Sequence, residues 1–94
     1  MHPVTVAVTV PSLLKDCTGG QSRFTIEATT LAQALQVLVE VYPLLRIHLY
    51  DEAGQLRTHV QIFYNQDSTR WLEDLAVPLK AGDRLSVLQA MSGG

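Results

Sequence analysis

The chain ends on residues that could do chemistry through the main chain alone. Its last two residues are Gly93 and Gly94. Because glycine has no Cβ, a pair of glycines can pass through a channel that is too narrow for any other residue. The α-carboxylate of Gly94 would be the reactive group at the tip, and with a free pKa of about 3.3 to 3.7 it is an anion that resists nucleophilic attack. Gly94 would therefore need activation by another protein before it could react.

The residues before this end show the pattern of a turn followed by a strand. Ala81-Gly82-Asp83 is typical of a turn, and Leu85 and Val87 then alternate with polar residues, which points both side chains inward. Residues 90–94 could extend about 17 Å, at about 3.3 to 3.6 Å each. We expect a folded body with a flexible C-terminal tail over about residues 90–94. A frayed terminus is the plainer alternative, since last residues are often poorly ordered.

Three histidines and one cysteine are the other candidate reactive side chains. His2, His48 and His59 have neither a helical i, i+4 pairing nor an acidic partner at metal-site spacing, so no metal site is predicted. Cys17 and His59 could in principle act as nucleophile and base, but no family signature surrounds either residue. We interpret them as structural or surface residues and predict no catalytic residue. Gly19-Gly20 lacks the Lys-Ser/Thr of a phosphate loop and indicates a turn.

Length, composition and charge favour one globular domain that binds other proteins. The 94 residues are 47% hydrophobic and 17% charged, which is typical of a folded chain, so we expect a single domain over residues 1–94. A net charge of −2 with no cluster of Lys and Arg argues against nucleic acid or an anionic membrane as partner. The longest apolar stretch is too interrupted for a membrane span, and the first residues do not resemble a secretory signal. With a single cysteine, these features predict a cytoplasmic protein.

Two segments near the start have the period-two alternation of strands. Residues 4–10 alternate Val with small or polar residues, and residues 23–27 alternate again, with Phe24 and Ile26 on one side. We expect them to pair as an antiparallel hairpin. Their connection, Pro11 to Gln21, is longer than the usual two to five residues.

One amphipathic helix should follow. Thr30 and Gln33 match a capping box, in which each side chain satisfies a free amide at the helix start. Pro43 should end the helix. Gln33, Gln36 and Glu40 should face water. The apolar positions at helical spacing are Leu31, Ala34, Leu35, Leu38 and Val41 or Tyr42.

The second half should add three strands. Leu44 to Tyr50 predicts a short helical turn, and Gln55 to Tyr64 contains a strand with Val60, Ile62 and Tyr64 on one face. Asn65 to Ser68 is typical of a loop, Thr69 to Leu72 predicts a short edge strand, and Trp71 is interpreted as a packing residue. The order β-β-α-β-β-β predicts an α+β fold with one helix on one face of a mixed sheet.

The end of the chain resembles a known family. The run from Gly82 to Gly94, which holds the Gly-Asp turn, a strand and the Gly-Gly end, is similar to the MoaD/ThiS sulfur carriers of the ubiquitin-like β-grasp group. Residues 18–21 and 64–67 look closest to carriers that serve cysteine biosynthesis. The resemblance covers essentially the whole chain and implies a mixed sheet of four to five strands packed on one main helix. Many members have proline just before the final small residues, where this chain has Gln89-Ala90.

The resemblance also implies a function. In this family an E1-like enzyme of the MoeB/ThiF type uses ATP to adenylate the terminal glycine, and sulfide or a persulfide then displaces AMP to leave a thiocarboxylate. Gly94 would carry the sulfur, Gly93 would allow entry to the channel, and Leu88 and Met91 would contact the partner. The chain would be a protein cosubstrate, not an enzyme, and would need no cofactor. A sulfur-accepting biosynthetic enzyme is the second implied partner, and a JAMM-type metalloprotease is a further candidate.

Several uses of such an end remain open from the sequence. The sulfur acceptor could be a cysteine precursor, molybdopterin, the thiazole of thiamine, a siderophore or tRNA. A second class of function is protein modification, in which Gly94 forms an isopeptide bond to lysines. A third is a β-grasp interaction domain with an inert tail, in which Gly93 and Gly94 would be dispensable.

Overall fold

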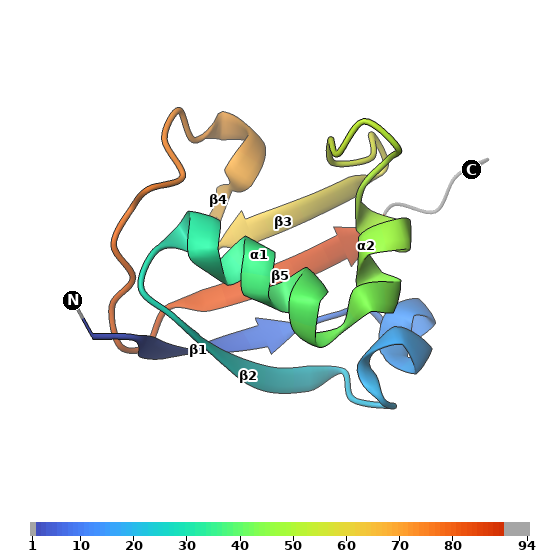
Figure 1. Ribbon diagram of the computed structural model, residues 1–94, viewed down its shortest axis with the longest axis horizontal. Coiled ribbons are helices and arrows are strands. Elements are labelled where there is room, and N and C mark those ends of the chain that lie inside the picture. The colour runs from blue at the N-terminus through green and yellow to red at the C-terminus, as the bar shows by residue number, and fades with distance from the viewer. Residues whose placement is uncertain (1, 90–94) are drawn as a thin grey trace.

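A computed structural model describes residues 2–89 (Figure 1). The expected tail over about residues 90–94 therefore lies outside the described residues, as does Met1. Five strands form one sheet in the order β2-β1-β5-β3-β4. The elements are strands β1 (Val4–Thr9), β2 (Arg23–Ala28), β3 (Val60–Tyr64), β4 (Asp67–Ser68) and β5 (Arg84–Gln89), helices α1 (Leu31–Val41) and α2 (Pro43–Leu49), and 3₁₀-helices at Ser12–Thr18 and Thr69–Trp71.

The sheet is mixed, as expected, and β5 lies at its centre. β1 and β2 form the predicted antiparallel pair, with Val6 opposite Ile26. β5 runs parallel to β1 on one side and antiparallel to β3 on the other. The parallel pair requires a crossover, and α1 supplies it by lying across one face of the sheet (Figure 1).

The core lies between α1 and the sheet because every strand alternates. Leu31, Ala34 and Leu38 point from α1 into the core, at the positions that the helical spacing predicts. The exposed positions of α1 include Gln33, Gln36 and Glu40, also as predicted. The sheet contributes buried hydrophobic residues from four strands, which are Val6, Val8, Ile26, Ala28, Val60, Ile62, Tyr64, Leu85 and Val87.

The start of α1 confirms the predicted cap at Thr30, but the Gln33 side chain bonds to a different residue from the one that a capping box predicts. The Thr30 hydroxyl oxygen accepts a hydrogen bond from the Gln33 N–H at 3.2 Å. The Gln33 side-chain oxygen reaches back to Thr29, one residue before the cap, and accepts from its N–H at 2.5 Å and from its hydroxyl at 2.7 Å. Two free donors at the helix start are therefore satisfied by local side chains.

Pro43 ends α1 and begins a second helix. The predicted short helical turn is the helix α2, which buries Leu45 and Leu49. Proline fits the first position of a helix because the N–H that it lacks would have no partner there. Of the two alternatives at the end of α1, Val41 is exposed, whereas Tyr42 packs edge-on against Phe24 with ring centroids 4.7 Å apart.

The prediction of an edge strand at Thr69 to Leu72 is wrong. Thr69–Trp71 is a 3₁₀-helix, and the edge strand is Asp67–Ser68, within the segment predicted to be a loop. The Ser68 hydroxyl oxygen accepts from the Arg70 N–H at 3.3 Å, a local bond that favours a turn over a strand. Trp71 is 81% exposed and is not the packing residue that we expected, since the 3₁₀-helix directs it to solvent.

The long connection between β1 and β2 is a packed segment. It contains the 3₁₀-helix Ser12–Thr18, which buries Leu14 and Thr18. The Thr18 hydroxyl donates to the Gln21 carbonyl at 2.5 Å and so closes the turn through Gly19 and Gly20. Among the described residues, no helix is both long and apolar enough to cross a membrane.

Thr30→Ala should lower the free energy of unfolding by about 1 kcal/mol, because it removes the cap acceptor of α1. Urea unfolding followed by circular dichroism measures this change. Thr30→Ser keeps the hydroxyl and should lose much less. Equal losses in the two variants would show that the methyl group, and not the hydrogen bond, stabilises this end of α1.

Candidate functional site

The site that the sequence proposes begins at the described end of β5. Ala7–Thr9 of β1 pair with Arg84–Ser86, whereas Val60–Tyr64 of β3 pair with residues 85–89. The last residues of β5 are thus held by β3 alone. Three of the proposed site residues, Met91, Gly93 and Gly94, follow this point and lie outside the described residues.

Leu88, the fourth proposed site residue, lies on the face of the sheet opposite α1. Its side chain is 52% exposed, as the alternation with buried Leu85 and Val87 predicts. It lies directly across from Gln61, next to the Phe63–Ser86 pair. A hollow of about 270 Å³ opens here, lined by Thr58, His59, Gln61, Phe63, Leu88 and Gln89. An apolar side chain therefore stands exposed at the base of the tail.

The other candidate reactive residues do not come together. His59 lies beside the end of β5, where its Nε2 is 3.3 Å from the Gln89 side-chain nitrogen. Cys17 is half-buried in the first 3₁₀-helix and packs against the core. His2 and His48 are exposed. Within residues 2–89, no three His, Cys, Asp or Glu side chains lie close enough to hold a metal ion.

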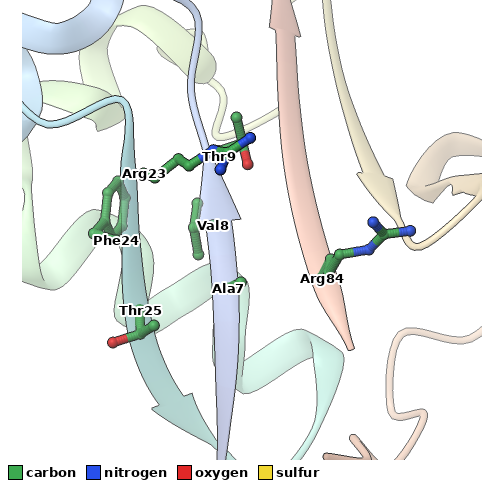
Figure 2. A pocket seen from close by; sticks show the side chains of 7 residues that line it. All are labelled: Ala7, Val8, Thr9, Arg23, Phe24, Thr25 and Arg84. Carbon is green, nitrogen blue, oxygen red and sulfur yellow. The ribbon is translucent and has the colours of Figure 1, made fainter. Parts of the chain in front are cut away.

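A second hollow, of about 460 Å³, lies over β1, β2 and the start of β5 (Figure 2). Arg23 extends from β2 across β1 toward Thr9, and Arg84 points away from β1 (Figure 2). The lining offers guanidinium and hydroxyl groups but no carboxylate, imidazole or thiol, so it lacks a general base. Its residues are Ala7, Val8, Thr9, Arg23, Phe24, Thr25 and Arg84.

A buried carboxylate fixes the start of β5. Asp83, which is 6% exposed, accepts hydrogen bonds from the Tyr64 hydroxyl at 2.6 Å and from the Lys80 N–H at 2.8 Å. Its other oxygen accepts from the Asn65 side-chain amide at 3.2 Å, and the Asn65 oxygen in turn accepts from the Arg84 N–H at 2.9 Å. Asn65 has a positive φ of 57°, a conformation that asparagine tolerates better than most residues. The turn before β5 is thereby tied to the turn after β3.

The protonation of this pair follows from its surroundings. Burial raises the pKa of Tyr64 to about 12, and the hydrogen bond to the Asp83 carboxylate and its charge add to the shift. Burial alone would raise the pKa of Asp83, but hydrogen bonds from Tyr64, the Lys80 N–H and Asn65 outweigh it and lower that pKa below its usual value. Tyr64 is therefore a neutral donor and Asp83 an anion near neutral pH.

Sequence reasoning missed this network. It treated Gly82-Asp83 as a turn and Tyr64 as one more buried strand position. The available signal was Tyr64 itself, since a tyrosine on a buried face needs a partner for its hydroxyl. Nothing in the sequence pattern shows that the partner is Asp83, nineteen residues further on.

Asp83→Asn should lower the free energy of unfolding at pH 7 by about 1 to 3 kcal/mol, because an amide NH₂ would face the donors that the carboxylate now satisfies. Ionised Asp83 stabilises the fold above its unfolded pKa of 3.8, and this contribution is lost as the pH falls through the lower folded pKa. The wild type should therefore lose more stability than Asp83→Asn below about pH 4 in urea titrations. Asp16→Asn, at an exposed carboxylate, is the matched control, and a loss equal to that of Asp83→Asn would contradict the prediction.

Known proteins are similar to this chain in both sequence and fold. The chain is 31% identical over 91 residues to the sulfur carrier protein CysO of Mycobacterium tuberculosis, which covers 95% of this chain and 98% of that protein. The matched chain in the crystal structure of the Amycolatopsis orientalis BexX/CysO complex has a TM-score of 0.78 at 25% identity, covering 95% of this chain and 99% of the other. The solution structure of small archaeal modifier protein 1 from Methanosarcina acetivorans has a TM-score of 0.76 at 26% identity, and the match covers 100% of both chains.

These likenesses confirm the predicted ubiquitin-like β-grasp fold. The model of the ThiS family matches residues 8–94, which is nearly the whole sequence and includes the turn at Gly82-Asp83, β5 and the final glycines. The chain belongs to the ThiS family.

Proposed function

We propose that the protein is a sulfur carrier whose Gly94 α-carboxylate is adenylated and then converted to a thiocarboxylate. The observation that carries this proposal is the family match, which extends through Gly94, together with the similarity to a relative named as a sulfur carrier. The described residues are consistent with it, because the central strand β5 places the exposed Leu88 side chain shortly before the final glycines.

The proposed chemistry takes place on the main chain. A carboxylate oxygen of Gly94 attacks the α-phosphorus of ATP, and pyrophosphate leaves. Sulfide then attacks the carbonyl carbon, the C–S bond forms, and the C–O bond to AMP breaks. If a persulfide is the donor, the same displacement leaves an acyl disulfide, and a thiol must then attack its S–S bond, which releases the thiocarboxylate and leaves a disulfide on the donor. An E1-like adenylating enzyme supplies ATP, the metal ion and the acid-base groups, so this chain acts as its protein cosubstrate.

The role of the fold is to hold the tail, residues 90–94, in position for the activating enzyme. β5 lies at the centre of the sheet, and the Asp83 network fixes its start. Gly93 would let the tail enter a narrow channel, since glycine lacks the Cβ that would clash there. Leu88, and Met91 beyond the described residues, would contact the activating enzyme around the hollow at the end of β5.

A biosynthetic enzyme would accept the sulfur. Similarity to CysO favours a cysteine precursor as the acceptor. The complex of BexX and CysO from Amycolatopsis orientalis shows that a protein of similar fold occurs in a complex with a second protein. A JAMM-type metalloprotease, which would release a product from the carrier, is a further candidate partner.

One observation favours a second use of the same adenylate. The chain is 26% identical over its full length to a protein named as a small archaeal modifier. In that use, the activated Gly94 would form an isopeptide bond to a lysine of another protein. The two uses differ in the final nucleophile, which is sulfur in one and an amine in the other.

Incubation with the activating enzyme, ATP and sulfide should raise the intact mass by about 16 Da, because sulfur replaces one oxygen of a carboxylate. Deletion of Gly94 should abolish the change, and deletion should not alter the circular dichroism spectrum. An unchanged wild-type mass would overturn the sulfur-carrier proposal. Gly94-dependent conjugates on denaturing gels, formed in place of the thiocarboxylate, would favour the modifier function.

Leu88→Glu should weaken binding to the activating enzyme about tenfold or more, because it places a charge in a desolvated apolar contact. Calorimetric titration measures the dissociation constant. Leu13→Glu is a matched control, since Leu13 is 71% exposed on the first 3₁₀-helix, away from the hollow at the end of β5. If both substitutions change the affinity equally, the contact at Leu88 is not specific.

A further inference from the structure

β2 is an edge strand with a free outer side. In the sheet order, β2 comes first and pairs only with β1 among the described residues. Figure 1 shows β2 along the lower margin of the sheet, with no helix or strand beyond it. An unpaired edge presents a row of N–H and C=O groups to any strand of matching pattern.

The register with β1 shows which backbone groups point outward. The Val10 N–H donates to the Ser22 carbonyl at 2.9 Å, which makes Val10 and Ser22 a hydrogen-bonded pair. In an antiparallel ladder such pairs alternate with non-hydrogen-bonded ones. Phe24, Ile26 and Ala28 therefore direct their backbone groups to β1, whereas those of residues 23, 25 and 27 point to the free side.

The side chains of residues 23, 25 and 27 are complementary to those of the same residues in a second copy. If a second copy lies antiparallel and Thr25 pairs with Thr25 of the copy, then Arg23 lies directly opposite Glu27 of the copy, and Glu27 opposite its Arg23. All three side chains lie on the exposed face of the sheet. Cross-strand pairs of opposite charge and pairs of threonines both stabilise a sheet. A shift of register by two residues would lose this match.

The face toward α1 is complementary in the same register. There, Phe24 lies opposite Ile26 of the second copy, and Ile26 opposite its Phe24. Phe24 is half-buried under Tyr42, while Ile26 already belongs to the core. Pairing of an aromatic with a β-branched side chain is favourable. The apolar layer would therefore continue across the edge, while the ion pairs form on the opposite face.

We propose that β2 is a self-association site through which two copies pair antiparallel about a two-fold axis at Thr25. Two sheets of five strands would then join into one of ten. Arg23 is exposed, and Figure 2 shows its side chain directed toward Thr9, so pairing with Glu27 of the copy would require a different rotamer. Because such an edge contact is small, the dimer should be weak. The site is independent of the proposed sulfur transfer, since β1 separates β2 from β5 and from the hollow that β3 and the end of β5 line.

Charge reversal tests the register. Sedimentation velocity at protein concentrations up to about 1 mM should show a monomer-dimer equilibrium for the wild type. Arg23→Glu alone, or Glu27→Arg alone, should lower the association constant about tenfold or more, because two attractive pairs become two repulsive ones. An equimolar mixture of the two variants should associate again, since each Glu of one chain then faces an Arg of the other. Arg46→Glu, at an exposed position of α2, makes the same charge change as Arg23→Glu and should leave the association unchanged.

Amide hydrogen exchange gives an independent readout. Raising the concentration should slow exchange at the N–H groups of Arg23, Thr25 and Glu27, which point outward, and not at Phe24 and Ile26, which β1 already binds. A wild type that stays monomeric at about 1 mM would overturn the proposal. So would dimerisation that survives both single reversals, or a mixture of the two variants that fails to associate. These measurements use no activating enzyme, so their outcome does not depend on whether Gly94 carries sulfur.

Discussion

The register of β5 is the constraint on which the rest of the structure depends. Its side chains alternate between the core, through Leu85 and Val87, and the open face, through Leu88. A slip by one residue would exchange the two sets. The Asp83 carboxylate opposes such a slip because its hydrogen bonds tie the turn before β5 to Tyr64 and Asn65, at the end of β3. One buried anion thus helps to fix both the core contacts of the central strand and the exposure of Leu88 on the open face.

The parts of the fold that the sequence predicts are those set by short-range patterns. The alternation at Val4–Thr9 and Val60–Tyr64 identifies strands and their buried faces, because side chains of a strand point to opposite sides. The cap at Thr30 and the stop at Pro43 act within one helical turn. The exposure of Leu88 follows from the same alternation.

The parts that sequence reasoning missed depend on distant or competing contacts. Thr69–Trp71 forms a 3₁₀-helix instead of a strand, since Ser68 caps it locally while Arg70 donates to the carbonyl groups of Arg57 and Val60. The pairing of Tyr64 with Asp83 joins two turns that are far apart in the chain. Of the candidate site, only the surroundings of Leu88 lie among the described residues, and the roles of Met91, Gly93 and Gly94 remain proposals.

The exposure of Trp71 has a practical consequence for the study of this protein. It is the only tryptophan in the chain, and its indole already lies in water in the folded state. Unfolding changes the polarity around it little, so the emission maximum is a poor gauge of folding. The same indole is well placed as an optical reporter of any molecule that covers the 3₁₀-helix after β4.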